Sequence, residues 1–507
     1  MEQANAARDI AIANQARFFP FDDLVLNLFK ECTPKILVVT DGLTFDGADF
    51  GLSDFINTLK NANIHGMKPI VKTAHRGASA ADFTNFTFSA STLHISKYDV
   101  VFLFGVDSFG TLQQSEINTI TDFMNAGGGV FATGDHETLG KALCGDIPRV
   151  RGMRRWVGPS ASGVDRISTN DPGANNAFDF ADQSDAIPQK IYPAYTGTTA
   201  NSQPHFLLQH PTKKIIEVLP DHPHESECVI PGNLADPTEW PKDAGGQVVS
   251  PELVALSMSY GGGFTGKQPI SQPRAFGAIG AYDGHKANVG RIAVDATWHH
   301  FININMIATG SGPGLAADAD VYDRVSTYFK NLAVWLMPKK VRKCLRWPLI
   351  ITMKKLYPVA EFVPGLVHGE RSLAATIEAG RELQATLARF MTPGEQREII
   401  DDLFETQSAH FAKHMAQIEA QPGDIASVFS QSMLPRRLIE QAALGALVYA
   451  AARAVPAGAD PASALKQAGG MEGLEKAAAA SLNDTFRQLG QAMMGGVRKL
   501  EMLIEHC

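Results

Sequence analysis

The sequence lacks both a long apolar run and an excess of basic residues. Of its 507 residues, 45% are hydrophobic and 19% are charged, and the formal net charge is −8. A chain of this size exceeds a single ordinary core, and its acidic balance argues against nonspecific binding to nucleic acid or anionic membranes. The longest apolar stretch, near residues 442–455, contains Arg453 and is too short to span a bilayer. With no basic-then-apolar signal segment at the start, we expect a cytoplasmic protein without membrane or nucleic-acid partners.

Cysteine is scarce. The chain has five cysteines, an odd number, and none of them forms a CxxC pair: Cys32, Cys144, Cys228, Cys344 and Cys507. Such scattered cysteines resemble the reduced thiols of a cytosolic protein more than a disulfide framework.

Several catalytic and cofactor motifs are also missing. No GxSxG or GxCxG elbow follows a predicted strand, and Cys144 has the character of an inert buried thiol. The glycine-rich pieces at 127–129 and 261–266 have neither the Walker lysine nor the GxGxxG spacing. We therefore predict no nucleotide cofactor, and a serine or cysteine hydrolase has little support.

Alternating strands and helices are present instead in the N-terminal three-fifths. Short runs of aliphatic and β-branched residues predict strands at 35–42, 69–74, 98–105 and from 128 onward. Helical spacing separates them at 52–61 and 113–125, and further regular segments are expected at 213–220, 251–260, 290–300 and 321–336. This order is typical of βαβ units, so we predict an α/β fold with a mostly parallel sheet and ligand crevices at the strand carboxyl ends.

Composition divides the chain into three parts. Residues 1–33 predict a helical lead-in, and 34–340 an α/β domain that carries a loop-rich insertion at about 149–204. Beyond Pro338 alanine-rich helical segments dominate, so we expect an all-α domain at 341–507, with one helix at 392–418. The segment 438–455 is apolar around much of its circumference, which favours a buried helix or an interface in a homo-oligomer.

Three groups of histidines and acids follow predicted strands. The chain has 15 histidines, and these groups are Asp135-His136-Glu137, then Asp221, His222, His224 and Glu225, then Asp295 with His299 and His300. Imidazole and carboxylate together bind Zn²⁺ or a similar divalent metal, and they also act as general acid and base without one. No HExxH is present, so both alternatives stay open.

We assign these groups the following roles. Metal ligands are expected among His136, His222, His224 and His299, and catalytic groups among Asp135, His136, Glu225, Asp295 and His299. Six other histidines are expected to be surface or hydrogen-bonded structural groups: His65, His75, His94, His410, His414 and His506.

Two further features suggest substrate contacts. Asp41 and Asp46 follow the first strand, although Asp-Gly is also a common turn. The run RVRGMRRW contains four arginines that suit a phosphate or carboxylate, or that simply pair with acids at the surface: Arg149, Arg151, Arg154 and Arg155.

The stretch YDVVFLFG, a helix, then GGGVFATGDHE resembles part of the trehalose-utilisation (ThuA-like) family, within the class I glutamine amidotransferase-like fold. In that family a glycine-rich strand leads to a histidine-containing loop, which His136 matches. The resemblance covers about residues 35–310 and implies a flavodoxin-like three-layer sandwich. It does not imply glutaminase activity, because Asp135 and His136 stand where amidotransferases have their cysteine.

Two later elements extend the resemblance. His210-Pro211 and the stretch to Glu225 are similar to the family's His-Pro element and acidic loop. The segment from Gly290-Arg291 to His299 is similar to its closing strand. The resemblance suggests sugar metabolism or carbohydrate hydrolysis.

Two functions follow from these patterns. One is a hydrolase-like enzyme, metal-assisted or not, that acts on a small carbohydrate or anionic substrate. The other is a non-catalytic ligand-binding or interaction protein, since this class of fold hosts many functions. Convergence of the three histidine groups favours catalysis, whereas wide separation favours binding.

Overall fold

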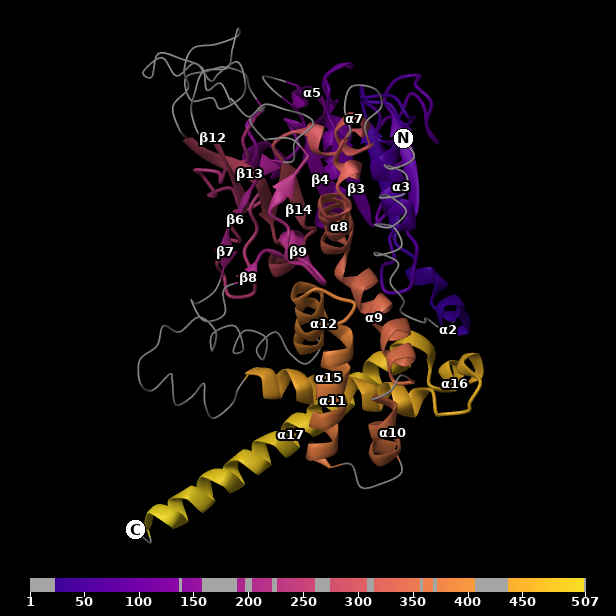
Figure 1. Cartoon of the computed structure of the whole chain (residues 1–507), viewed down its shortest axis with the longest axis vertical. Helices are drawn as coiled ribbons and strands as arrows, with labels where there is room; N and C mark the ends of the chain where they lie inside the picture. The colour runs from indigo at the N-terminus through magenta and orange to yellow at the C-terminus, as the bar shows by residue number, and fades with distance from the viewer. Residues whose placement is uncertain are drawn as a thin grey trace. The chain divides into compact units, whose positions relative to one another are not determined.

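The chain folds into two compact units, which are shown in the computed structural model of Figure 1. The structure describes residues 23–135, 139–156, 189–196, 203–220, 226–259, 274–307, 314–355, 359–367, 372–405 and 436–505. The first unit contains the described residues between 33 and 341, and the second contains those of 23–32 and 342–505. Across these described ranges, the structure has no helix that is both long and apolar enough to cross a membrane.

An eight-stranded sheet forms the first unit. Its order is β2-β1-β3-β4-β14-β13-β12-β6, and the first five strands are parallel. The parallel strands are β2 (Ile70–His75), β1 (Lys35–Thr40), β3 (Val100–Phe104), β4 (Gly129–Thr133) and β14 (Ile292–Asp295). The antiparallel strands are β13 (Arg274–Tyr282), β12 (Glu252–Ser259) and β6 (Tyr192–Pro193). The α/β class is confirmed, but β13 was not among the predicted strands.

Helices cover both faces of the sheet. On one face, Phe55 of α3 (Ser53–Asn61) packs against Phe102 and Phe104 of β3, and against Phe329 of α8 (Ala319–Leu336). Side chains that alternate with these along the strands point to the opposite face, where they pack against α4 (Gln114–Asn125). The near-continuous burial of the central strands follows from this double coverage.

Shorter elements complete the first unit. They are α5 (Lys141–Cys144), α6 (Val150–Met153), α7 (Asn303–Ile307), β5 (Gln189–Lys190), β7 (Tyr195–Thr196), β8 (Gln203–Pro204), β9 (Gln209–His210), β10 (Lys214–Ile215) and β11 (Val218–Leu219). The predicted segment 213–220 therefore forms two short strands, and the predicted strand 290–300 ends at Asp295 and continues into a 3₁₀ turn.

The described part of the second unit consists of helices. They are α2 (Asp23–Leu28), α9 (Lys339–Met353), whose first turn belongs to the first unit, α10 (Val359–Val367), α11 (Leu373–Leu387), α12 (Pro393–Glu405), α15 (Arg436–Ala454), α16 (Pro461–Gln467) and α17 (Gly470–Glu505). The predicted helix at 392–418 is present to Glu405, and its remainder lies outside the described residues.

Helix α15 lies at the centre of this unit, against α11 and α17. Its side chains are buried around most of the helix, as the apolar segment 438–455 predicted. Gly380 and Gly445 allow α11 and α15 to approach closely, because a Cβ on either glycine would collide with the backbone of the other helix.

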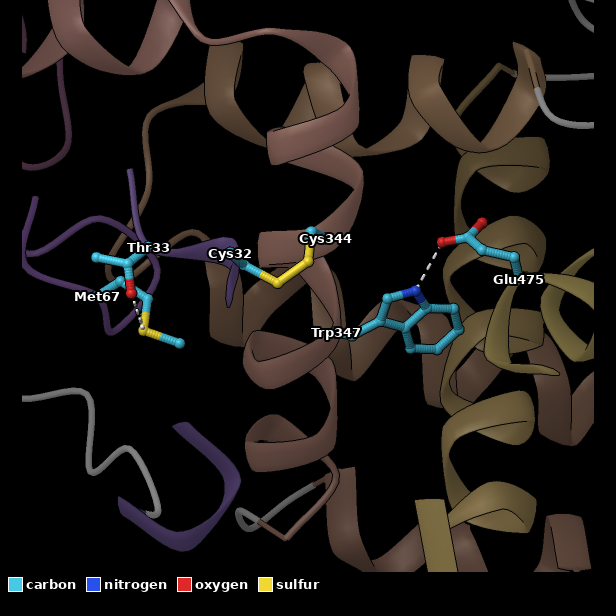
Figure 2. The surroundings of a disulfide bond; sticks show 6 residues. All are labelled: Cys32, Thr33, Met67, Cys344, Trp347 and Glu475. Atoms are coloured by element: carbon cyan, nitrogen blue, oxygen red, sulfur yellow. Dashed lines mark hydrogen bonds between the residues drawn. A yellow bond between two sulfur atoms is a disulfide. The ribbon is translucent and has the colours of Figure 1, made fainter. Parts of the chain in front are cut away.

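The expectation that all cysteines are reduced was wrong. Cys32 forms a disulfide with Cys344 of α9, with 5.6 Å between their Cα atoms, and so ties residues 23–32 to the helices of the second unit. Figure 2 shows this bond, together with the hydrogen bond that Trp347 donates to Glu475 of α17. The two cysteines are 312 residues apart, and such a pairing leaves no spacing signal in the sequence.

Candidate functional site

The five parallel strands end in register. His75, Thr40, Phe104, Thr133 and Asp295 pair with one another in a single row across the sheet. Residues at and just beyond this row therefore lie along one edge, as expected for parallel strands. Ionisable side chains occur there on or after every one of these strands, and the site is built from them.

Asp135 and His299 form the central contact of this edge. Asp135 follows β4 and is buried, and its Oδ2 lies 3.5 Å from Nε2 of His299. Thr297 donates a hydrogen bond of 3.1 Å to Oδ1 of the same carboxylate. Thr297 also caps the 3₁₀ turn that carries His299, accepting its backbone N–H at 3.1 Å, so one hydroxyl positions both members of the pair.

His299 is accessible, whereas its partner is not. The His299 side chain is 18% exposed, against 2% for that of Asp135. Its ring stacks on Trp298, with 4.4 Å between centroids, and Phe50 meets it edge-on at 6.4 Å. Two aromatic rings thus hold the imidazole over a buried carboxylate while leaving part of it open to a ligand.

The adjacent His300 has a different environment. It is fully buried, and its Nδ1 lies 2.7 Å from Oδ1 of Asp295, whose Oδ2 accepts a 2.8 Å hydrogen bond from Tyr328 of α8. Burial, together with the Asp295 carboxylate, raises the pKa of Tyr328 well above its usual value, so the phenol stays a donor. The contacts of this triad hold α8 against the end of β14, and the predicted catalytic role of Asp295 stays a prediction.

Arg154 joins the ends of β4 and β14. Its guanidinium is completely buried and donates to the carbonyl oxygens of Asp135, Asp295 and Ala296, and it lies over the Trp156 ring. These bonds satisfy backbone carbonyl oxygens at or just beyond the ends of β4 and β14, and they hold the ends of the two strands together.

The other predicted arginines are engaged with protein groups. Arg149 is buried and donates to Asn125. Arg151 is bidentate with Glu239, and Arg155 donates to Glu227. Acid pairing, one of the two alternatives for this run, thus accounts for Arg151 and Arg155.

Part of the predicted site lies outside the described residues: His136, Glu137, Asp221, His222, His224 and Glu225. Of the three histidine groups, the structure brings together the first and the third, through Asp135, Thr297 and His299. Within the described ranges, no cluster of three or more His, Cys, Asp or Glu side chains is arranged to hold a metal ion.

A pocket lies further along the edge, where β1 separates β2 from β3. Its volume is about 500 Å³, and it is lined by Asp41, Gly42, His75, Ala78, Ser79, Ser108 and Phe109. Asp41 is buried and accepts a 2.6 Å hydrogen bond from the backbone N–H of Val106. Burial raises its pKa to about 6, and the nearby Asp107 carboxylate contributes to the rise.

His75 also lines this pocket, although the sequence alone predicts a surface or hydrogen-bonded structural role for it. It ends β2 and is only 3% exposed. Its position directly after a predicted strand was the available signal, since the neighbouring strands carry acids at the same place. Thr297 and Tyr328 were missed because neither residue type marks a site without its spatial partners.

Compared with known proteins, the chain matches no family model, and no curated protein is significantly similar to it. The resemblance to the ThuA-like family therefore stays a prediction.

Proposed function

We propose that the protein is a hydrolase-like enzyme in which Asp135 and His299 act as general acid and base toward an attacking water. The observation that carries this proposal is the 3.5 Å contact between an accessible imidazole and a buried, oriented carboxylate. An imidazole nitrogen and a carboxylate at this separation can share one water and exchange protons with it, and the carboxylate stabilises the protonated imidazole.

The reaction we propose uses water as the nucleophile. Nδ1 of His299 is buried, so proton exchange takes place at Nε2, the atom beside Asp135. A contact of 3.5 Å is at the long limit for a hydrogen bond and leaves room for a bridging water, or for tightening when substrate binds. The free thiols of Cys144 and Cys228 are poor alternatives, since burial raises the pKa of both well above the usual value.

A divalent metal is a further part of the proposal. Imidazole and carboxylate are suitable donors, and the pair supplies His299 and Asp135. Further ligands would come from His136, His222 and His224, outside the described residues. When bound, such an ion would lower the pKa of a coordinated water. Metal content of the purified protein, measured before and after the change His299→Ala, tests this part separately.

The fold supports a ligand site at this edge. The parallel strands follow the order 2-1-3-4-5, with β14 as the fifth, which is the flavodoxin-like order. We propose on this basis a flavodoxin-like sandwich, followed by an all-α C-terminal domain that provides a surface for a homo-oligomer. The substrate is a small molecule, and carbohydrate or anionic compounds are the first to test.

The experiment is a screen of p-nitrophenyl esters, phosphates and glycosides with the wild type and three variants. Asp135→Asn and His299→Gln should lower kcat/KM at least about 100-fold, the usual contribution of a general acid or base. His94→Gln is the matched control, because His94 is exposed and its ring hydrogen-bonds to Ser96 of its own loop. Full activity in both site variants would refute the assignment.

A further inference from the structure

The pocket around Asp41 lies where a flavodoxin-like sheet reverses its strand order. β1 is the first strand along the chain, and its neighbours are β2 on one side and β3 on the other. The loops that leave β1 and β3 therefore diverge to opposite faces and open a crevice at the carboxyl edge, the usual place for a ligand in such folds. Asp41 follows β1 and Ser108 follows β3, and both line the pocket.

Side-chain-to-backbone hydrogen bonds fix the loops around the pocket. Thr40 Oγ1 accepts the backbone N–H groups of Gly42 and Leu43, which turns the chain sharply after β1. A Cβ on Gly42 would lie 2.5 Å from Ser108 Oγ, so only glycine lets that hydroxyl approach. Asp107 has a φ of +60° and accepts the N–H groups of Gly140 and Ala142, which fixes the β3 loop.

Two buried polar side chains line the pocket. One of them is a hydrogen-bond donor and the other is an acceptor. Nδ1 of His75 accepts the Gly77 N–H at 2.8 Å, so its proton is on Nε2, which bonds to no other described residue. Burial lowers the pKa of His75, so the ring is neutral and Nε2 is a donor. Asp41 offers a carboxylate, the acceptor of the pair.

Among the described residues, no cationic side chain is bound directly to the carboxylates of this pocket. Asp41 and Asp107 are both acidic, and Arg76, whose charge acts on Asp41 from a distance, is bound by two bonds to Glu116. A carboxylate taken out of water without a cationic partner is costly, and a cationic ligand would offset that cost.

An aromatic ring provides the apolar side of the pocket. Phe109 is 41% exposed, although it packs edge-on against His75, with 6.0 Å between centroids. A Cβ on Gly77 would collide with this ring, so the glycine makes room for it. An exposed aromatic face beside a carboxylate is a favourable environment for an organic cation.

We propose that this pocket binds a small organic ammonium compound, whose cationic nitrogen faces Asp41 and whose apolar part contacts Phe109. An acceptor atom on the ligand would take the hydrogen bond from Nε2 of His75. The inference concerns binding in the pocket and does not depend on the reaction proposed at Asp135 and His299.

The test measures binding of three probes of the same shape to the full chain by ligand-detected NMR. Benzylammonium should bind in the millimolar range, benzyl alcohol about tenfold more weakly, and benzoate not at all, because a charge-assisted hydrogen bond distinguishes them. Equal binding of the three probes, or no binding of benzylammonium at a concentration of about 20 mM, would overturn the proposal. This comparison needs no variant.

Variants locate the bound probe. Asp41→Asn should weaken benzylammonium at least about tenfold and abolish the preference over benzyl alcohol. Phe109→Ala should weaken it about two- to fivefold, the effect of an exposed cation–π contact. Asp122→Asn, at an exposed position on α4, is the control and should change nothing. Unchanged binding in both Asp41→Asn and Phe109→Ala would place the probe elsewhere and refute the assignment.

Discussion

Nε2 of His299 lies 3.5 Å from Oδ2 of Asp135, although the two residues follow strands on distant parts of the chain. The adjacent His300 makes a shorter contact with Asp295 but is fully buried. Two neighbouring histidines thus have different environments, one partly exposed and one buried in the core. The distinction depends on the 3₁₀ turn that begins after Thr297 and directs their side chains to different environments.

The buried triad predicts a stability effect. Tyr328→Phe removes the hydrogen bond to Asp295 Oδ2 and leaves a buried carboxylate oxygen without its donor. The free energy of unfolding should fall by about 1–3 kcal/mol, measured by urea denaturation. Tyr195→Phe is the control, because Tyr195 is 58% exposed and should stay within about 0.5 kcal/mol. Equal stability of both variants would contradict the structural role of the triad.

Asp41 predicts a pH dependence with a definite sign. Its pKa rises from 3.8 to about 6 on folding, mainly through burial, so between these values the folded state binds the proton more tightly than the unfolded state. Wild-type stability should therefore fall, relative to Asp41→Asn, as the pH rises from 4 to 7. The change is at most about 3 kcal/mol and is fully present above pH 6.

Denaturation of both proteins at several pH values measures this difference. Asp122→Asn, whose position is exposed, should keep a constant offset from wild type. A constant offset for Asp41→Asn as well would show that Asp41 ionises in the folded protein as it does in the unfolded chain.

The close approach of α11 and α15 predicts that glycine is required there. Gly445→Ala should destabilise the second unit by about 1–3 kcal/mol, because the new Cβ meets the Thr376 carbonyl. Gly490→Ala, at a helical position of α17 with no neighbour near the added Cβ, should instead stabilise by about 0.5–1 kcal/mol. Thermal unfolding of the two variants is the measurement, and shifts of the same sign would refute this packing.

The disulfide predicts a peptide linkage and a stability change. Mass spectrometry of the unreduced protein should detect the peptides of Cys32 and Cys344 joined. The double change Cys32→Ser and Cys344→Ser should lower the free energy of unfolding by about 2–5 kcal/mol. Two free thiols at these positions in protein purified without reductant would contradict the pairing. Because disulfides persist in oxidising compartments, the same measurement tests the expectation of a cytoplasmic location.

Local patterns were sufficient to predict the parallel half of the sheet. β1, β3 and β4 are apolar runs that are followed directly by aspartate or glycine, and α4 has clear helical spacing. These elements are specified by nearby residues and by burial on both faces, so a single sequence reveals them.

The remaining features depend on contacts between distant segments. Strand β13 contains Gly277 and Gly280, which weaken the strand pattern but are required because Cys228 and Val294 approach them closely. The meeting of Asp135 with His299 requires β4 and β14 to be neighbours, and strand order is not encoded in local periodicity. The disulfide between Cys32 and Cys344 likewise joins two residues that are far apart in the sequence.

The most direct test of the central claim is a double-mutant cycle of kcat/KM for Asp135→Asn, His299→Gln and the double variant, on the best substrate from the screen. If the pair acts as one unit, each single change and the double change should lower kcat/KM by a similar factor, at least about 100-fold. Independent, multiplicative losses, or full activity in either single variant, would contradict the proposed role of Asp135 and His299.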